Sequence, residues 1–100
     1  MTLLPNEIKR KLPSLYSQEN IKDPFAHVKF FCPWFSWTWY AVEFDGKDLF
    51  FGKVIGQESE LGYFSLSELK NLRGPGGLRI ERDIHFQPVP LSQCKCIKRG

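Results

Sequence analysis

The sequence contains few of the residues that usually build disulfide scaffolds, metal centres and proton-transfer sites. Its 100 residues include three cysteines, two histidines and one methionine. A small, odd number of cysteines argues against a disulfide-stabilised secreted scaffold, in which cysteines normally occur in even numbers. We therefore expect reduced thiols at Cys32, Cys94 and Cys96, as in a cytoplasmic protein.

Long apolar runs are also missing. No stretch approaches the roughly 18 to 20 consecutive apolar residues that a transmembrane helix requires. The first residues, MTLLPNEIKRKL, place their charges after a short apolar stretch, whereas a signal peptide places them before a longer one. These absences exclude a membrane-spanning helix, and they predict a cytoplasmic location with no membrane partner.

The motifs of common enzyme classes are absent as well. Residues 73–77, RGPGG, lack the Gly-Lys-Ser/Thr ending of a phosphate-binding loop and follow a predicted helix instead of preceding one. Cys94 and Cys96 are separated by one residue, which is not the spacing of a zinc pair. No nucleophile stands out beside a base. We expect a protein that is not an enzyme and that has no cofactor and no metal.

One row of side chains keeps an enzymatic alternative open. Glu81, Asp83 and His85 alternate along a predicted strand, which would place two carboxylates and an imidazole on one face. Successive side chains on one face of a strand stand about 6.5 to 7 Å apart, too far for all three to reach one small ion. A solvated strand face is the favoured interpretation, and a metal-dependent enzyme is the alternative.

Charge is distributed unevenly along the chain, although the net charge is only +3. Residues 1–29 hold five Lys and Arg against three acids, residues 30–72 hold three against six, and residues 73–100 hold six against two. The middle is therefore acidic and the ends are basic. The total is well below the dense basic stripe of a dedicated nucleic-acid-binding protein.

Apolar periodicity predicts an α+β fold. Alternation predicts strands at 25–32, 37–45, 49–56, 61–65 and 78–88. Leucine and isoleucine spacing predicts short helices at 5–12 and 65–72, and the capping box of Ser65 and Glu68 opens the second. Asp45-Gly46 supplies a tight hairpin turn. We expect an antiparallel meander of four to five strands with two short helices in one domain, residues 3–91, and a basic tail, residues 92–100.

The same alternation assigns side chains to faces. In the first strand it places Ala26, Val28, Phe30 and Cys32 together. In the second it sets Thr38, Tyr40, Val42 and Phe44 opposite Trp37, Trp39, Ala41, Glu43 and Asp45. In the last it points Ile80, Ile84 and Phe86 inward. Gly52 indicates a bulge or a close approach between backbones.

Three aromatic residues near residue 34 are hard to bury together. Trp34, Phe35 and Trp37 follow Pro33 at a junction between loop and strand. Stacking of nucleic-acid bases would need Lys or Arg beside the rings, but the predicted face of Trp37 carries acids instead. We predict that most aromatic residues of the run WFSWTWYAVEF, residues 34–44, are core and that these three residues anchor a protein partner. The alternative for the three is a local mini-core. Acidic complementarity to that partner would come from Glu43, Asp45, Asp48, Glu58 and Glu60.

A second hypothesis is that the chain binds nucleic acid. Its basic residues lie towards the two ends of the sequence, and they would bind phosphates with an affinity that falls steeply as salt rises. The residues concerned are Lys9, Arg10, Lys11, Arg73, Arg79, Lys95, Lys98 and Arg99.

Several blocks of sequence resemble a known bacterial family. LLPNEIKRKLPSLYSQE, HVKFF, WTWYAVEFDGKDLFFGKVIG, ELGYFSLSEL and RGPGGLRIERDIHFQP are together similar to the family called domain of unknown function 2958, over about residues 3 to 91. The resemblance implies genes carried on plasmids, integrative conjugative elements and phage-like elements, often near DNA-processing or anti-restriction genes. It supplies no catalytic residues. Residues 32–36, CPWFS, and the final CKCIKRG depart from the family pattern.

These observations favour a small binding protein carried by a mobile genetic element. We expect it to act on a nucleic-acid-processing enzyme or defence nuclease, as an anti-CRISPR or anti-restriction inhibitor does. The alternative is a nucleic-acid-binding accessory factor of conjugation or DNA processing. The sequence leaves the oligomeric state open, because an exposed edge of the meander can pair with its twin or with a foreign protein.

Overall fold

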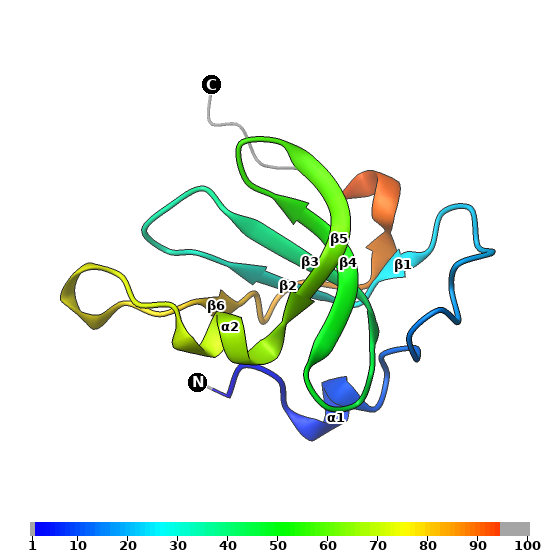
Figure 1. Cartoon of the computed structure of the whole chain (residues 1–100), viewed down its shortest axis with the longest axis horizontal. Coiled ribbons are helices and arrows are strands. Elements are labelled where there is room, and N and C mark those ends of the chain that lie inside the picture. The colour runs from blue at the N-terminus through cyan, green and yellow to red at the C-terminus, as the bar shows by residue number, and fades with distance from the viewer. Residues whose placement is uncertain (1, 95–100) are drawn as a thin grey trace.

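A five-stranded antiparallel sheet forms the centre of the fold, with strands in the order β5-β4-β3-β2-β6 (Figure 1). The computed structural model describes residues 2–94. A second sheet pairs β1 with β7. The strands are β1 (Phe25–Ala26), β2 (Val28–Phe31), β3 (Thr38–Phe44), β4 (Leu49–Ile55), β5 (Ser59–Ser65), β6 (Glu81–Arg82) and β7 (Val89–Pro90). The helices are α1 (Asn6–Lys9), α2 (Leu66–Asn71) and the 3-10 turns η1 (Pro75–Gly77) and η2 (Leu91–Gln93). The predicted α+β class is confirmed.

The main sheet is packed on both faces. The larger core holds a chain of stacked rings in which Phe50 lies 4.5 Å from Phe44 and 5.1 Å from Phe64, measured between ring centroids. Buried leucines of α2 and of the N-terminal segment cover this core. The smaller core, on the other face, joins Tyr40 and Val42 to Leu91 and Cys94 near the end of the described chain. Of the six aromatic residues between residues 34 and 44, Trp39, Tyr40 and Phe44 are therefore core residues.

The predicted first strand is broken at His27. Its N–H donates to the Ala41 carbonyl over 2.8 Å, and the chain changes sheets at this point. β1 pairs with β7, whereas β2 pairs with β3 and β6. As a result Ala26 belongs to the smaller core and Val28 to the larger one, so the prediction that they share a face is wrong although both are buried.

Burial of His27 makes stability depend on pH. Loss of solvation lowers the pKa of His27 below its ordinary value of 6.5. The unfolded chain then binds the proton more readily, so the free energy of unfolding should fall as pH drops through about 6.5 and stop falling below the folded-state pKa. Urea unfolding at pH 7.5 and 5.5 should show this loss in the wild type and a smaller one in His27→Gln. The exposed His85→Gln serves as control and should keep the wild-type loss; an unchanged loss in His27→Gln would contradict the assignment.

A β-bulge in β3 overturns the predicted faces of that strand. The pairing with β4 shifts between Ala41 and Glu43, so Val42 is the additional residue. The shift moves Phe44 into the larger core with Ala41, away from Tyr40 and Val42. A strict alternation had placed Phe44 on the opposite face, and it fails because a bulge inserts one residue into the period of two.

The helices follow their local signals closely. Ser65 Oγ accepts the Glu68 N–H over 3.1 Å, as the capping box predicts. The spacing of Leu66, Leu69 and Leu72 predicts a buried stripe on this helix. Leu66 and Leu69 are buried, but Leu72 is exposed because α2 ends one residue before it. α1 is shorter than predicted, with only its central turn helical.

One prediction for the end of the chain is wrong. The last strand is only the two residues of β6, and the chain turns away after it, which leaves Ile84 exposed while Ile80 is buried. Further on, the chain forms η2, and Cys94 is buried in the smaller core. Most of the predicted tail of residues 92–100, from Lys95 onward and including Cys96, lies outside the described residues. No helix in the described part is long and apolar enough to cross a membrane.

Candidate binding surface

The loop between β2 and β3 carries the three predicted anchor residues. Two glycines elsewhere in the chain receive its rings. A Cβ placed on Gly74 would lie 2.3 Å from Trp34 Cδ2, and one placed on Gly56 would lie 2.6 Å from Trp37 Cε2. Both rings therefore rest directly on backbone that has no side chain, which fixes their orientation.

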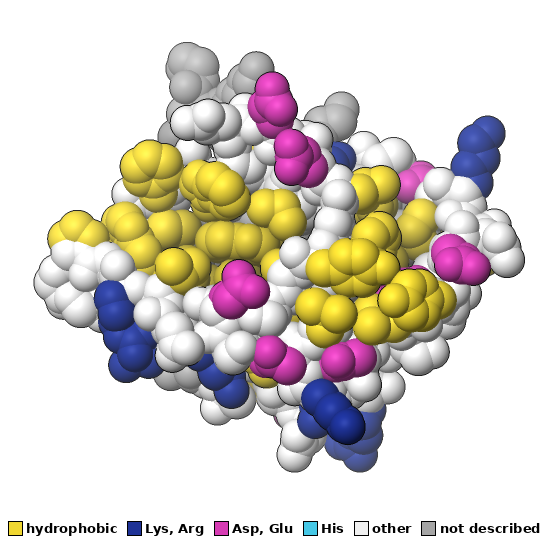
Figure 2. Space-filling model, viewed as in Figure 1, with side chains coloured by type: hydrophobic (Ala, Val, Ile, Leu, Met, Phe, Trp, Pro, Cys, Tyr) yellow, Lys and Arg dark blue, Asp and Glu magenta, His cyan; other side chains and the backbone are white. Residues whose placement is uncertain are grey.

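The loop residues differ in how far they reach solvent. Phe35 is 65% exposed and Trp37 is 39% exposed, whereas Trp34 is half-buried against the larger core. Two exposed leucines, Leu72 and Leu78, flank Gly74 in the segment on which Trp34 rests. We call these five residues the aromatic patch. Figure 2 shows hydrophobic side chains gathered in a broad area at this end of the sheet.

Two of the predicted acidic residues lie beside the aromatic patch. Glu58 is in the same tight turn as Gly56, whose N–H donates to the Glu58 carbonyl over 3.0 Å. Glu60 pairs with Val54, which pairs in turn with Trp39 across three strands. The Trp37 and Trp39 rings are 6.1 Å apart between centroids, so this row continues into the aromatic patch. Both acids are exposed and available to a partner.

The other acidic residues serve the fold. Asp45 Oδ1 accepts the N–H groups of Lys47, Asp48 and Leu49 at 2.7 to 3.0 Å, which closes the hairpin turn and lowers the pKa of Asp45. The Asp48 carboxylate accepts the N–H and hydroxyl of Ser67 at 2.8 Å, which ties this turn to α2. Both lie at the end of β3 and β4 away from the patch, so the structure does not bring these two predicted partner-binding acids beside the rings.

Glu43 was predicted to face a partner, and the structure contradicts this. It is only 4% exposed. Its Oε1 accepts the N–H of Tyr16 over 2.9 Å, and its Oε2 accepts the N–H of Gln18 over 2.8 Å. The bulge turns Glu43 towards the segment that follows Pro13, and the carboxylate holds that segment against the sheet.

The predicted basic residues do not form one surface. Lys9, Arg10 and Lys11 belong to α1 and the residues after it, whereas Arg73 and Arg79 flank η1, and Figure 1 shows the two segments well apart. Arg73 also donates to the carbonyls of Lys70 and Leu72 at 2.7 and 3.2 Å. The remaining candidates, Lys95, Lys98 and Arg99, lie outside the described residues.

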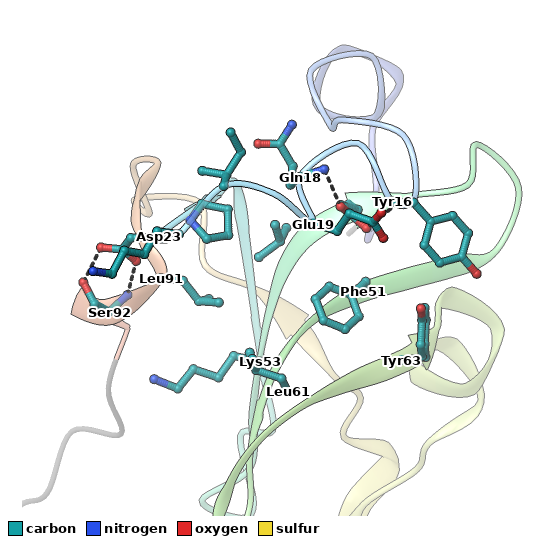
Figure 3. A pocket seen from close by; sticks show the side chains of 15 residues that line it. Tyr16, Gln18, Glu19, Asp23, Phe51, Lys53, Leu61, Tyr63, Leu91 and Ser92 are labelled. Atoms are coloured by element: carbon teal, nitrogen blue, oxygen red, sulfur yellow. Dashed lines mark hydrogen bonds between the residues drawn. The ribbon is translucent and has the colours of Figure 1, made fainter.

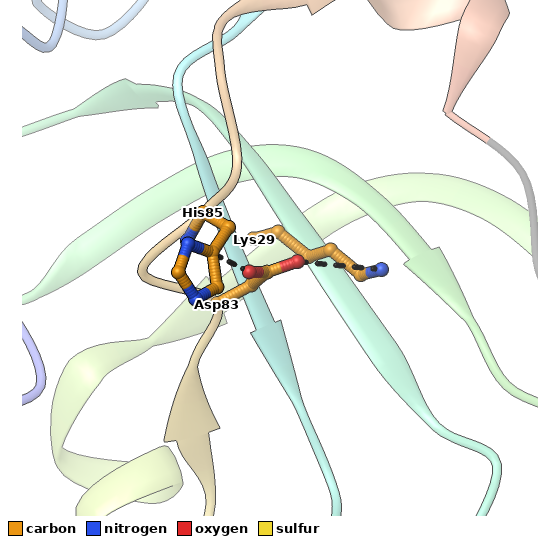
Figure 4. A network of polar contacts seen from close by, with 3 residues as sticks. All are labelled: Lys29, Asp83 and His85. Carbon is orange, nitrogen blue, oxygen red and sulfur yellow. Dashed lines mark hydrogen bonds and ion pairs between the residues drawn. The ribbon is translucent and has the colours of Figure 1, made fainter.

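Glu81, Asp83 and His85 do not line one face of a strand as predicted, because the strand ends at Arg82. Asp83 forms an ion pair with Lys29 at 3.9 Å, and its Oδ1 accepts the backbone N–H of His85 over 2.9 Å in a turn (Figure 4). Across residues 2–94, no group of three His, Cys, Asp or Glu side chains is placed to hold a metal ion.

Sequence reasoning missed a cleft of about 550 Å³ on the smaller-core face of the sheet. Its floor is formed by Phe51, Leu61 and Tyr63 from β4 and β5, and the segment after Pro13 forms one wall (Figure 3). Tyr16 stands at one end near Tyr63, and the interaction of their two hydroxyl groups raises the pKa of Tyr63. Lys53 lies at the other end and donates to the Cys94 carbonyl over 2.9 Å.

The walls of this cleft are held by long-range polar contacts. The Asp23 carboxylate accepts the N–H and hydroxyl of Ser92 at 3.0 and 2.6 Å, which lowers the pKa of Asp23 and joins the wall to η2. Tyr16, whose N–H binds Glu43, has a φ of 67°, a backbone conformation that is unfavourable for residues other than glycine. The apolar alternation of Leu61 and Tyr63 was the only signal for the cleft, because its walls come from segments far apart in the sequence.

Comparisons with known proteins give one positive result. A family model described as a protein of unknown function (DUF2958) matches residues 3–96. No curated protein and no solved structure matches the chain. The match extends beyond η2 and agrees with the burial of Cys94, which makes the last described residues part of the domain.

Proposed function

This chain belongs to the DUF2958 family of proteins of unknown function, and we propose that it is a non-enzymatic protein that binds a partner protein at the aromatic patch. The observation that carries the proposal is the exposure of Phe35 and Trp37 on a loop whose neighbouring ring, Trp34, is fixed in place. Exposed aromatic residues in a cluster are typical of binding hot spots.

The geometry of the loop favours tight binding. Trp37 contacts the backbone at Gly56 and the ring of Trp39, and Trp34 contacts Gly74. Side chains that are already ordered lose little conformational entropy when a partner binds, so more of the burial energy appears as affinity. Phe35 is the most exposed of the three and offers its ring to a pocket on the partner.

We further propose that the partner is a nucleic-acid-processing enzyme, such as a CRISPR effector or a restriction nuclease. Glu58 and Glu60 lie beside the patch and would complement the basic channel in which such an enzyme binds its substrate. The sequence resemblance to proteins of mobile elements supports the same class of partner. An accessory factor that binds nucleic acid is the alternative, for which Arg73 and Arg79 near the patch would supply the charge.

Phe35→Ala should weaken partner binding at least tenfold, since a hot-spot ring contributes about 2 kcal/mol or more and tenfold in affinity is about 1.4 kcal/mol. The thermal melt should stay within about 2 °C of wild type, because exposed substitutions change stability by roughly 0.5 kcal/mol or less. The measurement is capture of candidate nucleases from nuclease-treated bacterial lysate by tagged protein, followed by affinity measurement with the purified partner.

A matched control variant makes this test specific. Ile84→Ala removes an equally exposed apolar side chain in the turn after β6 and should bind like wild type. Trp34→Ala is less informative, because that ring also packs on the larger core. Undiminished binding by Phe35→Ala would show that the aromatic patch is not the binding site. Binding that disappears when the lysate is treated with nuclease would favour the nucleic-acid alternative.

A further inference from the structure

β5 is an outer strand of the main sheet and is exposed along most of its length. It pairs with β4 on one side, and no strand of the described residues pairs with its other edge (Figure 1). Leu61 is 63% exposed and Tyr63 is 51% exposed, although both are apolar residues in the middle of a seven-residue strand. An outer strand of this kind is a template for pairing with another chain.

The hydrogen bonds at the two ends of β5 show which of its backbone groups are directed outward. The Leu66 N–H donates to the Asp48 carbonyl over 2.8 Å, and the Glu58 carbonyl accepts the Gly56 N–H. Because alternate residues of an antiparallel strand bond to the same neighbour, the even-numbered residues of β5 bond to β4. The N–H and C=O groups of Leu61 and Tyr63 are therefore directed away from β4.

We infer that β5 pairs antiparallel with β5 of a second copy of this chain, on a two-fold axis at Gly62. Gly62 is the midpoint of Ser59–Ser65, so this register pairs all seven residues of the strand. It sets Leu61 of each copy opposite Tyr63 of the other, where both residues have outward backbone groups and exchange two hydrogen bonds. The pairing joins two five-stranded sheets into one.

The side chains support a second copy as the occupant of this edge. Each exposed Leu61 meets an exposed Tyr63, and apolar cross-strand pairs of this kind stabilise a sheet. Glu60 lies opposite Phe64 of the second copy, so like charges do not face each other. β5 contains neither the Lys nor the Pro that commonly protects an outer strand, and the register with β4 shows no bulge in it.

The axis predicts a specific cross-link. Gly62 of each copy meets its counterpart at a position where facing Cα atoms are about 4.5 Å apart, within the roughly 4.4 to 6.8 Å that a disulfide spans. A Cβ at Gly62 would meet nothing within 4 Å, so Gly62→Cys leaves the fold undisturbed. Glu60→Cys is the matched control on the same face, because the two copies of residue 60 would lie about 13 Å apart.

Both variants are made in a Cys96→Ser background, since Cys32 and Cys94 are buried. Under mild oxidation, most of the Gly62→Cys protein should become a covalent dimer, and a reductant should convert this dimer back to monomer. Glu60→Cys should form at least fivefold less cross-linked dimer. Equal cross-linking would indicate random collision and overturn the register, and so would preferential cross-linking of Glu60→Cys. An absence of cross-linked Gly62→Cys at high protein concentration would overturn the dimer.

A second variant tests the edge without cysteine. Leu61→Pro removes an N–H that does not bond to β4, a substitution that outer strands tolerate, and Leu61→Val keeps this N–H. Sedimentation equilibrium should show dimers for wild type and Leu61→Val, and a dissociation constant at least tenfold higher for folded Leu61→Pro. Monomeric wild-type protein at 100 µM, or an unchanged constant in Leu61→Pro, would overturn the inference. Phe35→Ala should leave this constant unchanged, which separates the dimer from the proposed partner site.

Discussion

Gly52→Ala should lose about 3 kcal/mol of free energy of unfolding, which for a domain of this size lowers the melting temperature by roughly 10 to 20 °C. The reason is steric. A Cβ at this position would lie 1.8 Å from the Tyr40 carbonyl oxygen and 2.9 Å from its carbon, both backbone atoms of the neighbouring strand. Strand β3 cannot give way without disturbing its pairing with β4 beside the bulge. Chemical denaturation and thermal melting measure the loss.

Gly62→Ala is the natural control, because Gly62 pairs with Gly52 in the same hairpin. A Cβ at Gly62 would meet nothing within 4 Å. This variant should be as stable as wild type or slightly more stable, since alanine reduces the conformational entropy of the unfolded chain. If the two alanine variants were equally stable, the close approach at Gly52 would not be a constraint on the fold.

Glu43→Ala should cost about 2 to 4 kcal/mol, because it removes two hydrogen bonds to a charged acceptor and leaves two backbone N–H groups without a partner. Those N–H groups belong to Tyr16 and Gln18. Their segment should then separate from the sheet, and limited proteolysis should cut it faster than in wild type. Glu43→Gln keeps one acceptor but turns an NH₂ group towards the second donor, so its loss should be intermediate.

Glu58→Ala and Glu60→Ala provide the comparison for Glu43. Both remove an exposed carboxylate from the hairpin of β4 and β5 and should change stability by less than about 0.5 kcal/mol. They should instead weaken binding of the proposed partner. A Glu43→Ala variant with the stability and protease resistance of Glu58→Ala would show that the buried carboxylate does not hold the segment.

Local signals in the sequence predicted local structure well. The turn at Asp45-Gly46 forms as expected, with Gly46 at a φ of 87°, and Ser65 caps α2. These features depend on residues within four positions of each other. The α+β class and the meander of β3, β4 and β5 followed from alternation, which is reliable as long as a strand keeps a period of two.

Features that depend on distant segments were predicted poorly. The bulge at Val42 leaves the run of apolar residues intact, so nothing in the sequence marks where the period changes. The sequence alone predicts a surface acid at Glu43, because the two donors that bury it lie 25 and 27 residues away in the sequence. The cleft could not be predicted for the same reason, because its lining residues come from segments that are far apart in the sequence. The sequence indicates that three large rings are hard to bury in one short loop, but it does not indicate which of them is exposed; in the structure Phe35 is the most exposed.

Trp34 and Trp37 of the loop between β2 and β3 contact two glycines, and these contacts allow the exposed residue of the loop to change without loss of stability. Trp34 and Trp37 are constrained by the bare backbone at Gly74 and Gly56, whereas Phe35 is directed to solvent and constrained by neither. A substitution at residue 35 therefore changes the shape offered to a partner while the free energy of unfolding stays nearly the same. A scaffold of this kind can evolve a new specificity through one loop position, without first acquiring a compensating mutation in its core.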